Sequence, residues 1–441
     1  MMDDIRRVFD LQRRNKWNLK TSSAEDRRAR LRRLRDAIAA HTGELAETLR
    51  ADLRRPVEGT IPAEARVVLA DIDQAIAELE QWMSPVEVEP SPHFAGTKAL
   101  IQYEARGVVL LFGAWNFPFG LVFQPLVPAI AAGNTAIVMP NELSVATAEL
   151  TARIIRETFD ESEVAVFTGG VELAEALLEL PVDHIFFTGS PAVGRRVMAA
   201  AARNLASVTL ELGGKCPAIV DGTADLASVV PVIGTGKLRN GGQICLSPDH
   251  VWVQEDHRDA FVAQYMQWVE QTYYRDGAID LEALPRIVNE RNFLRVTGYL
   301  ADATARGATL VGTGRSDSAT LTVEPAVLLD VPLDAQVMQD EIFGPILPVL
   351  TYRDLAEAVE HIQAREKPLA IYVYSTDEAT TAEVLARTSS GGVTVNGWAT
   401  HSAERRLPFG GVNHSGTGAY HGVHGFRELS HARGVVVHLM D

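Results

Sequence analysis

The feature that most constrains the fold is a regular alternation of apolar runs and helical segments that begins at Gly107. Strand-like runs such as "GVVLLFGAW" and "TAIVMP" alternate with helical segments such as "LSVATAELTARIIRETF". Continuous apolar strands separated by helices are typical of a parallel sheet with helices on both faces. Such a sheet binds its ligand at the carboxyl ends of its strands.

The alternation resumes after "ELGGKCP", residues 211–217, and predicts a second unit of the same kind. Two strand-like segments lie outside both units, and we expect them to pair with each other or with another subunit. We therefore predict an α/β fold of two Rossmann-like parallel-sheet domains with a small β bridging and oligomerisation element. The predicted boundaries are 1–92 and 107–210 for the first domain, 211–400 for the second, and 93–106 with 420–441 for the bridging element.

Composition excludes several classes of protein. The 441 residues carry a formal net charge of −16, and an acidic surface repels phosphate backbones, so we expect no nucleic-acid partner. No charged residue lies between Arg106 and Glu142, a length that could span a bilayer. Pro118, Pro125 and Pro128 interrupt this stretch, which instead divides into strand, helix and strand, so we expect no membrane partner.

The N-terminal region is rich in arginine, which could indicate a transit peptide or a helix on a membrane surface. Acidic residues are interleaved with the arginines, and Leu31, Leu34 and Ile38 fall at helical spacing. This pattern predicts a solvated helix with one buried stripe. The N-terminus has no apolar signal core and the chain has two cysteines, so we predict a cytoplasmic location with both thiols free.

Of the two cysteines, Cys245 has the more unusual context. It follows the polar, glycine-rich turn "NGGQ" in "LRNGGQICLSPDHV", where we expect exposed, flexible chain. A catalytic cysteine must be reachable and partly ionised, whereas the commoner fate of a cysteine is a buried structural thiol. Cys216 heads the apolar run "PAIV", and we predict a structural role for it.

Three further segments could carry chemistry. In "FTGSPAVG" a strand ends in a glycine turn before a helix, and the free N–H groups of a helix start, with Ser190, suit a phosphate. Alternation puts Glu211 on the same face as Thr209 and by itself favours a solvated strand glutamate. Asn116, in "AWNFP", could simply form an Asx turn. No metal-binding motif is present, so we predict no metal.

Six motifs occur in order along the chain, and together they resemble the aldehyde dehydrogenase superfamily. They are "GAWNFPF", "FTGSPAVG", "LELGGKCP", "NGGQICLSPD", "DEIFGPILPV" and "LPFGGVNHSGTGAYHGVHGFRELSH". The resemblance runs from about the first arginine-rich helix to the C-terminus. The short length, "CLSPD" after the thiol and "GAYHGVHGF" look most like the class 3 branch, which includes coniferyl-aldehyde and fatty-aldehyde dehydrogenases.

The resemblance implies a catalytic role for three residues. Cys245 matches the thiol that attacks the aldehyde carbon to give a thiohemiacetal. The Asn116 amide and the Cys245 N–H match an oxyanion hole. Transfer of hydride to a nicotinamide would leave a thioester. Glu211 matches the glutamate that activates water for hydrolysis, so the product would be a carboxylic acid.

The resemblance also implies a cofactor site, NAD or NADP, in the first domain and a homodimer assembled through the bridging segments. Glu341 matches the residue that holds the nicotinamide ribose, with Phe343 near the ring. Ser190 matches a pyrophosphate contact, and Glu142 an acidic residue near the adenosine ribose. The remaining expected cofactor contacts are Trp115, Gly189, Gly194 and Leu212.

Two positions depart from the family pattern. Met139 stands in "VMPNE" where the family usually has a lysine, which commonly contacts the adenosine ribose or a 2′-phosphate. Loss of that cation favours NAD over NADP. Asn413 stands in "GGVNHSG" where glycine is usual.

Two other functions compete with hydrolytic oxidation. Members that transfer the acyl group to coenzyme A generally lack the water-activating glutamate, and Glu211 is present. A non-catalytic protein that keeps the fold is favoured by Met139 alone. The substrate is expected to be an apolar aldehyde, aromatic or medium-chain aliphatic, from the apolar residues around Cys245 and Asn116, which are Ile244, Leu246, Trp115, Phe117 and Phe119.

Overall fold

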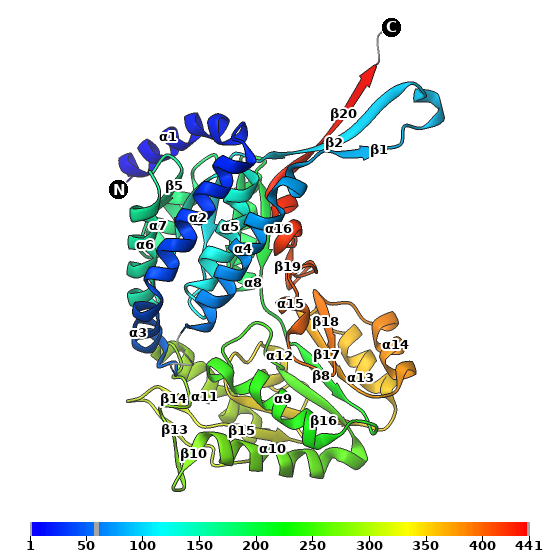
Figure 1. Cartoon of the computed structure of the whole chain (residues 1–441). Coiled ribbons are helices and arrows are strands. Elements are labelled where there is room, and N and C mark those ends of the chain that lie inside the picture. Colours follow the sequence, from blue (N-terminus) through cyan, green and yellow to red (C-terminus); the bar gives the residue numbers. More distant parts are fainter. Residues whose placement is uncertain (1, 57–60, 439–441) are drawn as a thin grey trace.

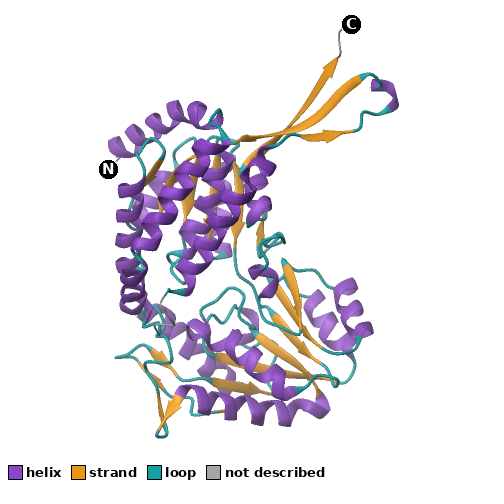
Figure 2. Cartoon of the chain, viewed as in Figure 1, coloured by secondary structure: helices purple, strands orange, loops and turns teal. Residues whose placement is uncertain are grey.

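The computed structural model describes residues 2–56 and 61–438. Figure 1 shows two parallel sheets in separate halves of the molecule, and a third sheet that projects as an arm from the first half. Helices cover the faces of both main sheets, as Figure 2 shows. The predicted α/β fold with two parallel sheets and a small additional β element is confirmed.

The first sheet has six strands, and its five parallel strands follow the predicted alternation. From edge to edge they are β19 (Gly416–Thr417), β7 (Ser207–Glu211), β6 (His184–Thr188), β3 (Val108–Phe112), β4 (Thr135–Met139) and β5 (Val164–Val166). β19 is antiparallel to β7. The helices between these strands are α5 (Gly120–Ala132), α6 (Val145–Thr158), α7 (Val171–Leu178) and α8 (Pro191–Ala202).

The uncharged stretch therefore forms β3, α5 and β4, as predicted, and every residue of both strands is buried. Pro125 and Pro128 lie inside α5. Four N-terminal helices pack on this half; they are α1 (Met2–Lys20), α2 (Ala24–Ala40), α3 (Thr42–Leu53) and α4 (Ala63–Met83). The predicted stripe of Leu31, Leu34 and Ile38 on α2 is buried. Within the described residues, no helix is both long and apolar enough to cross a membrane.

The second sheet has seven strands, and only β12 runs antiparallel to its neighbour. In spatial order they are β12 (Thr309–Val311), β15 (Ala326–Leu329), β16 (Ile346–Tyr352), β9 (His250–Gln254), β8 (Pro217–Val220), β17 (Ala370–Tyr374) and β18 (Gly392–Val395). Its helices are α9 (Leu226–Leu238), α10 (Arg258–Tyr273), α11 (Glu290–Ala305), α12 (Gln336–Gln339), α13 (Leu355–Gln363), α14 (Glu378–Arg387) and α15 (Thr400–Ala403). Two short hairpins, β10 (Tyr274–Arg275) with β11 (Ala278–Ile279) and β13 (Ser316–Asp317) with β14 (Thr322–Val323), extend this half.

The arm is a three-stranded antiparallel sheet of β1 (Val86–Val88), β2 (Thr97–Ala105) and β20 (Ser430–His438). β2 and β20 pair from Thr97 opposite His438 to Ala105 opposite Ser430, so the two strand-like segments pair with each other. β1 precedes the predicted start of the bridging element at residue 93, while α16 (Gly422–Glu428) packs on α4 and α5 of the body. Of the predicted segments, residues 1, 57–60 and 439–441 lie outside the described residues.

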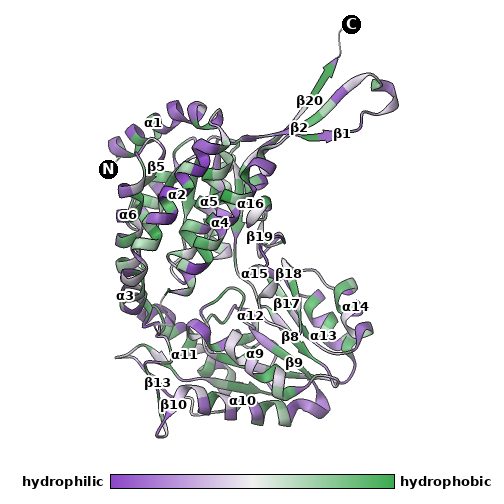
Figure 3. Cartoon of the chain, viewed as in Figure 1, coloured by the Kyte–Doolittle hydropathy of each residue, from purple (hydrophilic) through white to green (hydrophobic). Residues whose placement is uncertain are grey.

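Hydropathy follows this architecture. Figure 3 shows apolar residues concentrated along the strands of both main sheets and polar residues on the outer helices. Strand β20 differs from the strands of the main sheets, because an apolar side chain of β20, Val436 on the projecting arm, is 56% exposed.

Candidate active site

Cys245 is carried by a turn that only small or specialised residues can form. After α9, a short 3-10 helix spans Arg239–Gly242, and Asn240, Gly241 and Gly242 have φ angles of +54°, +63° and +77°. A side chain at Gly242 would collide with the backbone of Gly344. The turn is buried, so the expectation of exposed, flexible chain is wrong; its glycines allow close packing against the "FGP" segment.

Cys245 is a free cysteine, and the residue is partly exposed. Burial, together with the nearby charges of Glu341 and Glu211, raises the pKa of Cys245 to about 12. The backbone N–H groups of Cys245 and Leu246 act in the opposite direction and lower this pKa, but by less. At neutral pH the thiol therefore carries its proton, and a nucleophilic role requires a nearby base to remove it.

The Asn116 side chain lies against the turn that carries Cys245. Its Nδ2 donates to the carbonyl oxygen of Gln243 at 3.1 Å. The Nδ2 of Asn240 donates to the carbonyl oxygens of Asn116 at 3.0 Å and of Gln243 at 3.2 Å. The segment after β3 and the thiol-bearing turn are thus joined, and an Asx turn is not the role of this buried amide.

Glu211 ends strand β7 and is 4% exposed, so the interpretation as a solvated strand glutamate is wrong. Neither carboxyl oxygen of Glu211 has a hydrogen-bond partner among the residues that the structure describes. Burial and the charge of Glu428 raise the pKa of Glu211 well above its usual value. Glu428 itself accepts a hydrogen bond from Thr209, two residues before Glu211, at 2.7 Å. A buried carboxyl group without a partner is suited to exchange protons with a neighbour.

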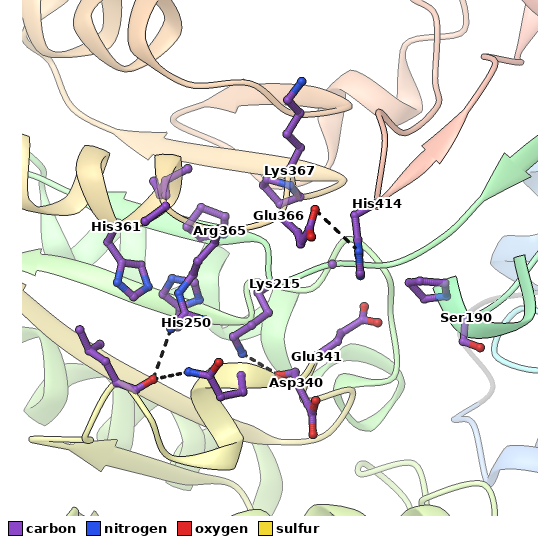
Figure 4. Close-up of a pocket in the computed structure, with 18 of the residues that line it drawn as sticks. Ser190, Lys215, His250, Asp340, Glu341, His361, Arg365, Glu366, Lys367 and His414 are labelled. Atoms are coloured by element: carbon purple, nitrogen blue, oxygen red, sulfur yellow. Dashed lines mark hydrogen bonds and ion pairs between the residues drawn. The ribbon is translucent and has the colours of Figure 1, made fainter. Parts of the chain in front are cut away.

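A cavity of about 930 Å³ opens beside Glu341, and Figure 4 shows side chains that line it. Ser190 and Arg195, from the start of α8, line it together with Gly214 and Glu341. Ser190 is the N-cap of α8, which begins at Pro191, so a helix does start after the glycine turn, as predicted. The other lining side chains in view include Lys215, His250, Asp340, His361, Arg365, Glu366, Lys367 and His414.

The segment that carries Glu341 is held by three charged side chains, of which Asp249 is buried. The ammonium group of Lys215 lies 2.5 Å from a carboxylate oxygen of Asp249 and donates to the Asp340 carbonyl oxygen at 2.7 Å. The other Asp249 oxygen accepts from the Ile342 N–H at 2.8 Å. Arg295 donates to the Ile342 carbonyl oxygen at 2.7 Å. Backbone groups on both sides of Glu341 are therefore fixed.

Glu341 itself is poised to titrate near neutrality. Burial and the charge of Asp249 raise its pKa to about 8, against the Gly214 N–H, Arg295 and Lys215, which lower it. A side chain at Gly213 would collide with the Glu341 carboxyl group, so this glycine makes room for it. The carboxyl group remains available to accept hydrogen bonds from hydroxyl groups.

The other predicted cofactor residues fall into two groups: those in or near contact with neighbouring side chains, and Glu142 on the surface. The rings of Trp115 and Phe343 meet edge to face with centroids 5.4 Å apart, and Phe343 has a φ of +48°. A side chain at Gly189 would come within 2.5 Å of the Phe187 ring, and one at Gly194 within 2.9 Å of Leu212. Glu142 is exposed. Among the described residues, Ser190 and Glu341 are the predicted cofactor residues that line the cavity, and the others do not.

Met139 and Asn413, the two departures, have different surroundings. Met139 is buried in an apolar cluster with Phe112, Ile137 and Phe187. Asn413 has a φ of +54°, in the left-handed region that glycine favours and that asparagine tolerates better than most residues. It forms a bridge to Gly416, next to β7, so the backbone shape is kept without glycine.

The residues present fit a dinucleotide. A helix N-terminus with Ser190 suits phosphate, and the glycine-lined approach at Gly213 and Gly214 leads to the Glu341 carboxyl group. The Trp115 and Phe343 rings add apolar surface nearby. No group of three or more histidine, cysteine or acidic side chains suited to a metal occurs in the described part of the chain.

Sequence reasoning missed the residues that hold these groups in place. Lys215, Asp249 and Arg295 each fix the Glu341 segment, and Arg55 and Glu64 contact the Asn116 segment. Lys215 and Asp249 lie within quoted motifs, and a charged residue between apolar runs was a usable signal. Nothing local marks Arg55 or Glu64.

Two α/β units with a thiol, an amide, a buried carboxyl group and a dinucleotide-sized cavity are typical of dehydrogenases that work through cysteine. The chain belongs to the aldehyde dehydrogenase family, whose model matches residues 2–435. It is 39% identical to coniferyl aldehyde dehydrogenase of Pseudomonas sp. strain HR199, over 92% of this chain and 86% of that one. It is 39% identical to a dimeric NADP-preferring aldehyde dehydrogenase of Canis lupus familiaris, over 95% and 91%.

A solved structure agrees with these relatives. The substrate-bound state of Staphylococcus aureus AldH superposes with a TM-score of 0.92 at 37% identity, covering 98% of this chain and 94% of that one. The protein is thus an enzyme that oxidises aldehydes.

Proposed function

We propose that this enzyme oxidises apolar aldehydes to carboxylic acids with a nicotinamide cofactor, through a covalent intermediate on Cys245. The observation that carries the proposal is the free thiol of a partly exposed residue. Its pKa is raised by burial and by two nearby carboxylates, one of them without a hydrogen-bond partner among the described residues. A nucleophile with a proton acceptor and an amide beside it is the arrangement that acyl chemistry requires.

In the first step, Glu211 takes the thiol proton and the Cys245 sulfur bonds to the aldehyde carbon. The carbonyl double bond becomes a C–O⁻ single bond in a thiohemiacetal. The Asn116 amide and the Cys245 N–H donate hydrogen bonds to this oxyanion. The raised pKa of Glu211 supports its role, because a carboxylate with a higher pKa is a stronger base.

The nicotinamide cofactor, when bound, supplies a hydride acceptor for the thiohemiacetal carbon, and a thioester on Cys245 results. Ser190, at the start of α8, would hold its pyrophosphate, and Glu341 its nicotinamide ribose. Phe343 and Trp115 would contact the ring. Gly189, Gly194 and Leu212 would shape the remaining surface, and Glu142 would face the adenosine end.

Hydrolysis of the thioester completes the cycle. Glu211 first releases to solvent the proton that it took from the thiol. It then removes a proton from water, and the water oxygen attacks the thioester carbon. The C–S bond then breaks, the carboxylic acid leaves, and the Cys245 thiol is restored by the proton.

The proposed preference is NAD over NADP. Met139 is buried in the core and offers no cation at the position where a lysine would meet a 2′-phosphate. The Canis relative is described as NADP-preferring, so the proposed preference for NAD would distinguish this chain from that relative.

The proposed substrates are aromatic or medium-chain aliphatic aldehydes. Ile244 and Leu246 flank the thiol, and Phe117 lies beside Asn116. The Pseudomonas relative is named for an aromatic aldehyde, which supports this class.

We further propose a cytoplasmic homodimer joined through the arm, with cofactor binding in the first domain and catalysis in the second. Exposed valines on β20, such as Val436, and on β1, such as Val88, favour burial against a second subunit.

The test is a reduced-nicotinamide assay with an aldehyde panel and NAD or NADP, run with and without coenzyme A and followed by product analysis. Matched Cys245→Ala and Cys216→Ala variants are assayed beside the parent. We expect turnover with NAD that falls by at least about 10³-fold in Cys245→Ala and persists in Cys216→Ala. Turnover that survives Cys245→Ala would contradict the role of Cys245 as the nucleophile. Acyl-coenzyme A in place of free acid, or no turnover at all, would instead favour acyl transfer or a non-catalytic role.

A further inference from the structure

The Asn116 amide is held from outside both sheets, by two residues that no motif marks. Arg55 lies just after α3, and Glu64 lies in the first turn of α4. They form an ion pair with side chains 14% and 4% exposed. Neither residue lines the cavity described above.

Glu64 fixes the chain that follows Asn116. One of its carboxylate oxygens accepts hydrogen bonds from the backbone N–H groups of Phe119 at 2.9 Å and Gly120 at 2.6 Å. These donors lie at the start of α5, where a carboxylate also meets the positive end of the helix dipole. The other oxygen pairs with Arg55. The turn from Asn116 into α5 is therefore anchored to α4.

Arg55 joins this turn to the one that carries the thiol. Its guanidinium group donates to the carbonyl oxygen of Asn116 and, at 3.0 Å, to the side-chain oxygen of Asn240. It also lies over the Phe117 ring, 4.6 Å from the centroid. One planar group with several donors in fixed directions thus spans two segments that are far apart in sequence.

The network closes on the Asn116 side chain. The Asn240 side chain, oriented by Arg55, donates to the carbonyl oxygens of both Asn116 and Gln243. The Gln243 carbonyl oxygen in turn accepts from the Asn116 amide at 3.1 Å. The position of that amide relative to the turn of Cys245 is consequently set by Arg55.

We propose that Arg55 and Glu64 are positioning residues for the oxyanion hole. They act through Asn116 and Asn240 and touch neither substrate nor cofactor. The inference rests on the proposed function of Asn116 and Cys245. Oxyanion stabilisation depends on donors held within a few tenths of an ångström, so a loosened amide lowers the rate of acyl chemistry while leaving the thiol in place.

The neighbouring Arg54 supplies a matched control. It joins the same segment to the second half, through the carbonyl oxygen of Leu284 at 3.1 Å and the hydroxyl of Thr322 at 2.8 Å. No hydrogen bond from Arg54 to the Asn116 segment is found within the described residues. If the segment that carries Arg54 and Arg55 only stabilises the fold, substitution of either arginine should lower the activity equally.

The experiment compares Arg55→Met, Arg55→Lys, Glu64→Gln and Arg54→Met. For each variant we would measure kcat for aldehyde oxidation, KM for NAD, and the rate of Cys245 alkylation by iodoacetamide, a reaction that forms no oxyanion. We expect Arg55→Met to lower kcat by about 10- to 100-fold, below the loss of about 10²–10³ for removal of a donor. Its alkylation rate and KM for NAD stay within about twofold of the parent values.

Arg55→Lys and Glu64→Gln, which keep part of the network, should have intermediate kcat values and serve if Arg55→Met does not fold. Arg54→Met should keep kcat within about threefold. Equal kcat losses in Arg54→Met and Arg55→Met, or a parallel loss of alkylation, would overturn the proposal. Failure of the proposed function would be distinguishable, because it would appear as turnover by the Cys245→Ala variant, in which Arg55 and Glu64 are unchanged.

Discussion

Cys216 and Cys245 lie in contact yet have opposite surroundings. The Sγ of Cys216 donates to the Cys245 carbonyl oxygen at 3.3 Å and accepts from the Ala370 N–H at the same distance. Cys216 is 0% exposed and belongs to the core, whereas Cys245 is partly exposed at the end of a glycine turn. One thiol thus has a donor and an acceptor inside the core, and the other belongs to a residue that is partly exposed.

The difference shows that access and neighbouring groups, rather than intrinsic acidity, distinguish the two thiols. Burial raises the pKa of both Cys216 and Cys245. Only Cys245 combines partial exposure of the residue with the Asn116 amide on its turn and a buried carboxyl group nearby. A structural thiol can therefore sit next to a reactive one without sharing its chemistry.

The largest contrast is expected in alkylation of the folded protein. Iodoacetamide should modify Cys245 at least about 10³-fold faster than Cys216, because buried Cys216 reacts only when the core opens. Peptide mapping by mass spectrometry after timed quenching measures both rates. As a control, the two alkylation rates should converge in urea. Comparable labelling of Cys216 and Cys245 in the native protein would contradict the proposed difference in their accessibility.

A smaller effect is expected from pH. Because the pKa of Cys245 is raised to about 12, the thiolate fraction of the cofactor-free enzyme should grow about tenfold per pH unit between pH 7 and 9. Alkylation rates in a Cys216→Ala background should follow this slope without a plateau. A plateau near pH 8 would mean that the thiol ionises far more readily than its surroundings indicate.

The smallest effect is expected for removal of the structural thiol. Cys216→Ala should lower the free energy of unfolding by about 1–3 kcal/mol, because it leaves a small cavity and deprives the Ala370 N–H of its acceptor. Urea unfolding of the parent and the variant gives this difference. Aldehyde turnover should stay within about threefold, and a much larger loss of turnover would show that the two thiols are coupled.

Much of the fold was predictable because burial on both faces of a strand leaves continuous apolar runs. The runs at Val108–Phe112 and Thr135–Met139 were identified for this reason. Helix α11 was not predicted, although its buried residues, which are Phe293, Val296, Tyr299, Leu300 and Ala303, are helically spaced. Strand β15 has only four residues, too few for a reliable pattern.

The site was only partly predictable because motifs identify groups and not their surroundings. Alternation could not reveal that Glu211 is buried, since it pairs with Gly416, about two hundred residues later. Arg55 contacts residues 61 and 185 positions away, so no local pattern points to it. The turn before Cys245 was expected to be exposed because its residues are polar. It is buried because these polar residues bond to each other.

The late arrival of β19 beside β7 bears on how the enzyme is made. A nascent chain that has emerged only through the second sheet still has the outer edge of β7 open, since Gly416 and Thr417 are not yet available to cover it. An open strand edge is prone to pair with other chains. Glu211, at the end of that strand, reaches its final surroundings only after residues 416 and 417 have been made. The pairing that covers the open edge of β7 therefore also completes the surroundings of Glu211.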